Sequence, residues 1–265
     1  MSAYSVKAYN TAHASENKIH DDEVARRFGF TGALVPGVEV YAYMMHLPVE
    51  RWGRAFLERG VAECRFASPV YDGEIALVEA SGQGDAMVME VNSQGRRCAT
   101  GSARMPAHPA LLPTVTDFPP GEPPQPDARP PGDERSLPVG GWLHSFPLTI
   151  GASDASTYLE EVRETDGLYA REGLVHPGMV LRLCNKALLQ SVKISPWIHV
   201  GSVVQNHGVA KVGETLVAHG RIAGNYEKKG HRFVEFDALV LAGGTRPVAG
   251  VRHIAIYRPR GANSP

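Results

Sequence analysis

The residue types best suited to acid/base chemistry gather near the amino terminus of this 265-residue chain. The segment HASENKIHDD, residues 13–22, holds Glu16, Asn17 and His20 in close succession. A histidine titrates near neutral pH and can carry a proton in catalysis, while a neighbouring carboxylate or amide can orient a water molecule. The same stretch is also typical of a helix start, because acidic residues directly follow His20. Both interpretations are open from the residues alone.

A glycine follows a short apolar run soon after this segment. GALVPG ends at Gly37 and precedes the apolar stretch VEVYAYMMHL, whose spacing predicts a helix. Free N–H groups at a helix start favour negative charge, and a glycine lets a carbonyl group approach the backbone closely. Gly37 is therefore a candidate donor to an oxyanion. Tyr41, on the same predicted helix, is expected in the core or in a pocket wall.

The second half of the chain repeats this order of segments. GLVHPG ends at Gly178 and precedes the apolar stretch MVLRLCNKALLQSV, and the pair Gly213-Glu214 follows Gly73-Glu74 by 140 residues. In both halves, alternating apolar residues then predict several antiparallel strands. This recurrence indicates an internal duplication.

A proline-rich stretch separates the two halves. Residues 108–138 are crowded with proline, glycine and charge, so we predict a linker between one repeat at 1–107 and another at 139–265. An apolar helix followed by a meander of strands is an α+β pattern, in which the strands wrap the helix. Two such units can pair their sheets edge to edge, so that each covers an edge the other leaves exposed.

Composition argues against several classes of partner. A formal net charge of −1 disfavours nucleic acid and an anionic membrane. The three cysteines are widely spaced and predict neither a metal site nor a disulfide framework. The first residues lack the apolar core of a signal peptide, and no apolar run reaches the length of a membrane span. We therefore expect a cytoplasmic protein.

At this point the residues resemble a known family. NKIHDDEVARRFGFTGALVPG is similar to the active-site segment of the MaoC-like (R)-specific enoyl-thioester hydratases and dehydratases, and Asn17, His20, Asp22 and Ala25 fit its pattern. The strand segments RFASPVYDGE, KVGETL and RPVAGVRH also look like segments of this family. The resemblance covers both halves outside the linker. It implies a double hotdog fold, with two antiparallel sheets each wrapped round a central apolar helix.

The chain departs from the family motif in both halves. Ser15 stands where the family carries its catalytic Asp, and Glu16 is the nearest carboxylate. In the second half, Asp154 lies near the equivalent place, but no Asn–x–x–His follows it. Asp154 also fits a helix cap. His176 matches a family position that is usually structural.

These observations predict a hydratase or dehydratase acting on an enoyl thioester of fatty acid metabolism, with the site centred on His20. The predicted catalytic residues are His20, Glu16, Asn17 and Ser15, and the predicted substrate-binding residues are Gly37, Tyr41, Gly178, Asp154 and His176. We expect no metal and no cofactor, with the acyl group carried as a coenzyme A thioester. The cluster YEKKGHRF, residues 226–233, is either a contact for coenzyme A phosphates or a solvated hairpin end. A homodimer of such chains is possible.

Two other functions fit the same residues. Other hotdog proteins hydrolyse thioesters with a carboxylate, a role open here to Glu16 or Asp154. A non-catalytic scaffold that binds acyl ligands is the second alternative, and the incomplete motif in each half is its main support.

Overall fold

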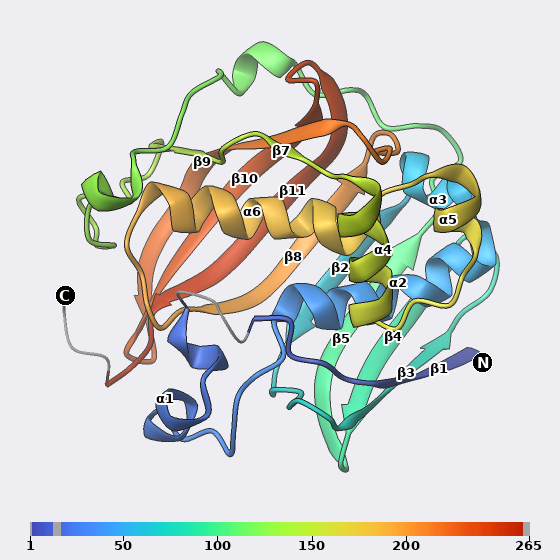
Figure 1. Cartoon of the computed structure of the whole chain (residues 1–265), viewed down its shortest axis with the longest axis horizontal. Helices are drawn as coiled ribbons and strands as arrows, with labels where there is room; N and C mark the ends of the chain where they lie inside the picture. Colours follow the sequence, from blue (N-terminus) through green and yellow to red (C-terminus); the bar gives the residue numbers. More distant parts are fainter. Residues whose placement is uncertain (1, 13–16, 262–265) are drawn as a thin grey trace.

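The structure, a computed structural model, describes residues 2–12 and 17–261. Its frame is one antiparallel sheet of eleven strands in two halves (Figure 1). The first half runs in the order β1 (Ser2–Lys7), β3 (Ile75–Ser81), β4 (Ala86–Ser93), β5 (Arg96–Arg104) and β2 (Val61–Phe66). The second half continues with β8 (Ile198–Asn206), β11 (Arg246–Arg258), β10 (His231–Ala242), β9 (Thr215–Lys228) and β6 (Trp142–His144), and the short β7 (Leu148–Thr149) pairs with β9.

The two predicted sheets are joined into one by the pairing of β2 with β8. The register runs antiparallel from Val61 opposite Gln205 to Arg65 opposite Gly201. Each of these strands would otherwise leave unpaired N–H and C=O groups at a sheet edge. The predicted edge-to-edge pairing is therefore confirmed.

Two long apolar helices lie on the same face of this sheet, one over each half (Figure 1). They are α2 (Gly37–Trp52) and α6 (Pro177–Ser191), which pack against each other near the β2–β8 seam. Twelve consecutive residues of α2, from Val38 to Val49, are buried, so the helix is surrounded by protein on all sides. Together with the sheet this is the double hotdog arrangement expected from the sequence.

Shorter helices complete each half. They are α1 (Asp22–Arg27), α3 (Arg54–Arg59), α4 (Ala152–Glu161) and α5 (Leu168–Glu172), with 3-10 turns η1 (Lys18–His20), η2 (Val115–Asp117) and η3 (Pro126–Ala128). No helix in residues 2–12 and 17–261 combines the length and apolar character needed to cross a bilayer.

The duplication extends to individual side-chain contacts. Glu74 accepts two hydrogen bonds from the Arg96 guanidinium, and Glu214 accepts two from Arg246. Each carboxylate also accepts a backbone N–H from the residue three positions before it. Both pairs stabilise the tight turn before a strand, so the two repeats share the same turn structure and the same Glu–Arg contact.

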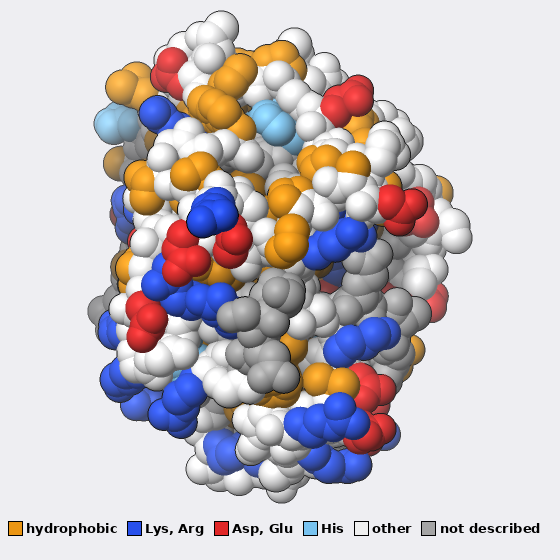
Figure 2. Space-filling model, turned by 90° about the vertical axis from the view of Figure 1, so that its left-hand side faces the viewer, with side chains coloured by type: hydrophobic (Ala, Val, Ile, Leu, Met, Phe, Trp, Pro, Cys, Tyr) orange, Lys and Arg blue, Asp and Glu red, His pale blue; other side chains and the backbone are white. Residues whose placement is uncertain are grey.

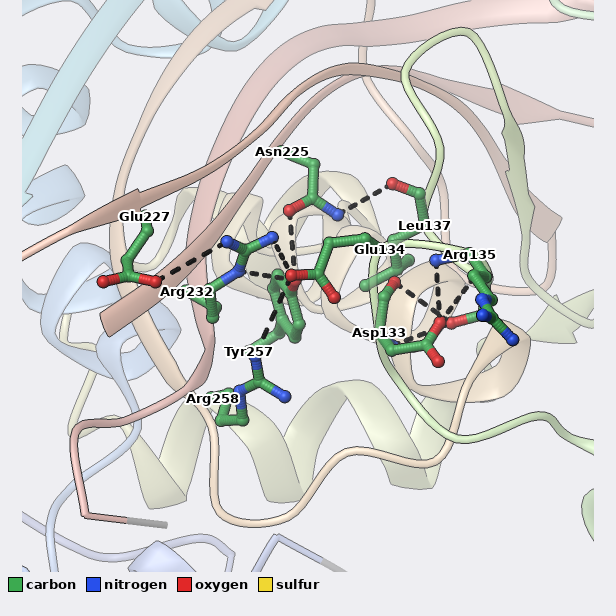
Figure 3. A network of polar contacts seen from close by, with 10 residues as sticks. Asp133, Glu134, Arg135, Leu137, Asn225, Glu227, Arg232, Tyr257 and Arg258 are labelled. Atoms are coloured by element: carbon green, nitrogen blue, oxygen red, sulfur yellow. Dashed lines mark hydrogen bonds and ion pairs between the residues drawn. The ribbon is translucent and has the colours of Figure 1, made fainter. Parts of the chain in front are cut away.

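The segment between the repeats packs against the second half. Glu134 forms an ion pair with Arg232 of β10, and the amide of Asn225 on β9 donates to the carbonyl oxygen of Leu137 at 2.9 Å (Figure 3). Earlier in the same segment, Val115 and Phe118 pack against a small apolar cluster on the sheet, formed by Val217, Leu239 and Leu241. Part of residues 108–138 is thus held to the strands rather than extended into solvent.

A buried ion pair ties α2 of the first half to the second half. The carboxylate of Glu39 is fully buried and accepts a hydrogen bond from the Arg182 guanidinium of α6 at 2.7 Å. The Tyr158 hydroxyl of α4 donates to its other oxygen at 2.8 Å. A buried carboxylate is tolerated only when such partners replace the water it has lost.

Arg182→Met should therefore destabilise the fold strongly. The substitution keeps side-chain volume but leaves the Glu39 carboxylate buried without a cation, at a cost of about 3–5 kcal/mol in free energy of unfolding. Urea denaturation measures the difference. Arg97→Met, which removes an exposed pair with Glu90, is the matched control and should change the unfolding free energy little. Equal effects of the two substitutions would contradict this account of the seam.

Candidate active site

A cavity of about 220 Å³ lies where the two halves meet. Its walls are mostly apolar with a few polar groups, as is typical of small-molecule sites. Residues that line it from the first half include Asn17, His20, Phe30, Gly37, Phe66 and Val70, and those from the second half include Asn185, Trp197, His199 and Ile256. The cavity therefore depends on the join between β2 and β8.

His20 is held at this cavity with one ring nitrogen fixed. Its Nδ1 lies 2.7 Å from the carbonyl oxygen of Leu34. A carbonyl only accepts, so Nδ1 carries the proton and Nε2 presents its lone pair. Asp22 accepts the N–H of Ala33 at 2.7 Å and so brings Leu34 back towards His20. Nε2 is therefore the basic nitrogen of the ring.

The loop that carries His20 has a small core of its own. Ile19, Ala25 and Leu34 are buried together and pack against Ile198 of β8. Asp21 caps α1 by accepting the N–H groups of the next turn. The acidic residues after His20 thus serve the helix start, while the histidine side chain lines the cavity.

Asn17 links this loop to the second half. Its Oδ1 accepts the backbone N–H of Trp197 at 3.1 Å, and its Nδ2 donates to the Trp197 carbonyl oxygen at 3.1 Å. These two bonds settle the orientation of the amide, because each backbone group can play only one role. Nδ2 then also lies 3.3 Å from Nε2 of His20. Asn17 positions the imidazole relative to the opposite wall.

Gly37 is the first residue of α2 and lines the same cavity. Its N–H has no hydrogen-bond partner within the described part of the chain. A side chain is disfavoured there, since a Cβ would lie 3.0 Å from both His199 Nδ1 and the Phe66 ring. The positive end of a sixteen-residue helix and a free N–H together favour an oxyanion at this point.

A buried histidine pair stands beside Gly37. Nε2 of His199 lies 2.9 Å from the Ser202 hydroxyl, which lies 3.0 Å from Nδ1 of His253, and the two rings stack with centroids 4.1 Å apart. Burial lowers the pKa of His199 to about 3 and that of His253 well below its usual range. Both rings are therefore neutral at physiological pH.

The start of α6 has a smaller copy of the cavity. A space of about 20 Å³ is lined by residues that follow those of the large cavity by 140 positions. The matched sets are Val35, Gly37, Val40 and residues 68–70 in the first half, and Val175, Pro177, Val180 and residues 208–210 in the second. The structural counterpart of Gly37 is thus Pro177, which has no N–H. Gly178, the match expected from the sequence, lies one residue further on.

The other predicted site residues of the second half take part in local structure. The Gly178 N–H donates to Nδ1 of His176 at 3.1 Å, and a Cβ on Gly178 would lie 2.0 Å from the Tyr158 hydroxyl oxygen. His176 is buried, with Nε2 directed at Glu164 at 3.4 Å. Asp154 accepts the N–H of Gly151 at 2.9 Å and caps α4. This is the helix-cap role that the sequence also allowed for this residue.

The structure therefore brings together His20, Asn17 and Gly37 and places the other described candidates apart from them. Tyr41 is fully buried in α2 and is not among the residues that line the cavity. Ser15 and Glu16 lie outside the described residues. The lining residues of the second half, such as Trp197 and His199, were not predicted. The sequence gives only a weak indication of them: His199, Ser202 and His253 are polar residues at buried positions of strands whose other buried residues are mostly apolar.

Within residues 2–12 and 17–261, no three His, Cys, Asp or Glu side chains gather in a way that could hold a metal ion.

Comparison with solved structures supports the fold. A protein from Mycobacterium tuberculosis described as having a double hotdog fold aligns with a TM-score of 0.64 and 16% identity, covering 96% of this chain and 95% of that one. A protein from Chloroflexus aurantiacus assigned as a MaoC domain dehydratase aligns with a TM-score of 0.60 and 13% identity, over 97% and 94% of the two chains.

A protein from Novosphingobium aromaticivorans assigned as a thioesterase is also similar, with a TM-score of 0.52, 15% identity and coverage of 85% and 88%. No protein-family model and no curated protein sequence matches the chain. At these identities the likeness shows the double hotdog fold and leaves the reaction open.

The neutral state of His199 has a measurable consequence. Below about pH 6.5 the unfolded chain binds a proton at this residue, but the folded chain does not until about pH 3. Stability should therefore fall as the pH falls through this window. His199→Gln removes the group and should reduce the slope of unfolding free energy against pH by up to about 1.4 kcal/mol per pH unit.

Urea unfolding of both proteins between pH 4 and 7 gives the slopes. His108→Gln, at an exposed position, is the control and should behave like the wild type. An unchanged slope in His199→Gln would contradict the lowered pKa, because it would show that this ring takes up its proton at the same pH in the folded and the unfolded chain.

Proposed function

We propose that this chain is a hydratase or dehydratase that adds or removes water at the double bond of an enoyl thioester. The observation that carries the proposal is that one cavity holds two groups: His20, whose Nδ1 proton faces the Leu34 carbonyl so that Nε2 is the basic nitrogen, and the Gly37 N–H, which has no partner among the described residues. The first can take a proton from water, and the second can hold the charge that develops on a thioester oxygen. The fold shared with a protein assigned as a MaoC domain dehydratase supports it.

In the direction of hydration, we propose the following roles for these groups. Nε2 of His20 takes a proton from a water molecule, whose oxygen attacks the β-carbon of the double bond. Electron density moves to the thioester oxygen, held by the Gly37 N–H at the start of α2. The proton then passes from the imidazolium to the α-carbon, which completes the addition of water. Asn17 keeps the ring aimed during both proton transfers.

A second group, a carboxylate that orients the attacking water, is also part of the proposal. Glu16 directly precedes Asn17 in the chain, so we place it as the group that orients the water, with Ser15 beside it. Both residues lie outside the described part of the structure.

We assign the reaction to the first half alone. In the second half the counterpart of Gly37 is a proline, the nearest glycine N–H already bonds to His176, and the space is only about 20 Å³. The second half then serves as a wall of the working cavity through residues such as Trp197 and His199.

The surface beside α1 suits a carrier that bears phosphate groups. Figure 2 shows the side of the molecule on which α1 and the end of β11 lie, where Lys and Arg side chains are widely spread. Exposed basic residues there include Lys18 of η1, Arg260 just after β11, and Arg26 and Arg27 of α1. The last two also pair with Asp22 and Glu23 of the same helix. Coenzyme A and a phosphopantetheine arm both present phosphates, so we propose one of them as the carrier.

Thioester hydrolysis is the second candidate function. The similarity to a protein assigned as a thioesterase favours it, and the same base and oxyanion donor could direct water to the carbonyl carbon. Other hotdog thioesterases use a carboxylate for this step, and the described lining of the cavity contains no Asp or Glu.

His20→Ala should remove hydration of crotonyl-CoA while the protein stays folded. Loss of a positioned base typically lowers kcat/KM by about 10²–10⁴-fold. The disappearance of the enoyl-thioester absorbance measures hydration, and a thiol reagent detects hydrolysis in the same sample. His108→Ala, which alters an exposed histidine, is the control. Undiminished hydration by His20→Ala would refute the assignment, and release of free thiol by the wild type would favour the second function.

Gly37→Pro tests the oxyanion donor separately. Proline suits the first turn of a helix, and α6 shows this with Pro177 at the equivalent position. Pro36 already has the extended conformation that a following proline requires. The variant removes the N–H and should lower kcat by about 10²–10³-fold.

Gly37→Ala is the matched control, because it adds the Cβ but keeps the N–H. A loss no larger in the proline variant than in the alanine variant would show that steric crowding, rather than the lost donor, explains the effect.

A further inference from the structure

Three residues of the second half that line the cavity each carry a buried polar atom with no hydrogen-bond partner in the described part of the chain. They are Asn185 on α6, Trp197 just before β8, and His199 on β8. Asn185 Oδ1, Trp197 Nε1 and His199 Nδ1 are each buried and have no hydrogen-bond partner within the described residues. Trp197 and His199 are only 4% and 6% exposed.

Such atoms are uncommon in native proteins, because a buried donor or acceptor that has lost water and gained no partner is destabilising. Five other atoms of this kind occur among the described residues, on side chains that do not line this cavity. The gathering of three at one cavity, all from the same half, points to a ligand that supplies the missing hydrogen bonds.

The chemistry of the three groups limits what that ligand can be. The Trp197 indole N–H only donates, so its partner must be an acceptor. The Asn185 amide can donate or accept. Burial keeps His199 neutral, so its Nδ1 is an acceptor if Nε2 donates to the Ser202 hydroxyl and a donor if Nε2 accepts from it. No Lys, Arg, Asp or Glu lies in the described lining of the cavity. A charged group would therefore be buried there without a counterion, which is strongly unfavourable.

We propose that the acyl group this cavity accepts carries a neutral hydrogen-bonding substituent, a hydroxyl or a carbonyl, bound by Asn185, Trp197 and His199. The inference rests on the proposed hydratase function and narrows its substrate class. An unsubstituted alkyl chain offers none of the three atoms a hydrogen bond, whereas a hydroxyl or carbonyl oxygen is an acceptor of the kind that the Trp197 indole N–H lacks. The first half then supplies the reacting groups and the second half supplies recognition of the chain.

The test compares trans-2-hexenoyl-CoA with its 4-, 5- and 6-hydroxy derivatives and with a derivative that ends in a carboxylate. We expect the wild type to use at least one hydroxy derivative with a kcat/KM roughly 10- to 100-fold above that of the parent compound. The carboxylate derivative should be used less well than the parent.

Variants then assign the preference to the residues. Asn185→Leu and Trp197→Phe keep most of the side-chain volume and should each lower the ratio of the two kcat/KM values, hydroxy derivative over parent, about tenfold. Ile256→Leu changes an apolar residue of the same cavity and should leave the ratio within about twofold. Trp197→Phe removes the indole N–H but keeps an aromatic side chain, so a lower ratio in this variant is not explained by collapse of the cavity.

Equal use of the parent and all hydroxy derivatives by the wild type, with ratios that no variant changes, would overturn the inference and indicate that water fills these hydrogen bonds. If the wild type hydrates none of the compounds, the proposed function fails instead. Calorimetric binding of hexanoyl-CoA against the matching hydroxyhexanoyl-CoA then still decides the inference: tighter binding of the hydroxy compound, weakened by Asn185→Leu, supports it, and equal binding contradicts it.

Discussion

The pair of hydrogen bonds between the Asn17 amide and the backbone of Trp197 is the constraint on which the site depends. It joins residues 180 positions apart and holds the His20 loop of one repeat to the start of β8 in the other. Two hydrogen bonds in a buried setting define both distance and orientation. Because β8 is itself fixed by its pairing with β2, the base, the oxyanion donor and the opposite wall form one rigid arrangement across the seam.

The two repeats keep the same structural contacts but differ at their helix starts. The Glu74–Arg96 and Glu214–Arg246 pairs show that the turn before each long strand is built in the same way. At the helix starts, Gly37 leaves a free N–H and an open space, whereas Pro177 has no N–H and the hydroxyl of Tyr158 occupies the space beside Gly178. Tyr158 instead binds the buried Glu39. The second repeat thus contributes stability and a wall, and the proposed chemistry belongs to the first.

The sequence predicted those features that depend on local patterns. Apolar periodicity and the recurrence of Gly-Glu turns gave the two repeats, and the double hotdog fold is confirmed. His20, Asn17 and Gly37 do share a cavity, because they lie on one short loop and the helix that follows it. Trp197 and His199 could not be predicted as cavity residues, because only the β2–β8 pairing brings them near the His20 loop, which is distant from them in sequence. The offset of 140 residues between the Gly-Glu turns already places Pro177 opposite Gly37, although the similar segments GALVPG and GLVHPG favoured Gly178. The matching backbone bonds of Val35 and Val175 confirm the register with Pro177.

The most direct test of this account is a crystal structure with 3-hydroxybutyryl-CoA, the hydrated product of the simplest substrate. The account predicts that the thioester oxygen lies within hydrogen-bond distance of the Gly37 N–H and that the 3-hydroxyl lies against Nε2 of His20. An acyl group bound with its thioester at the start of α6, or with the hydroxyl remote from His20, would contradict it.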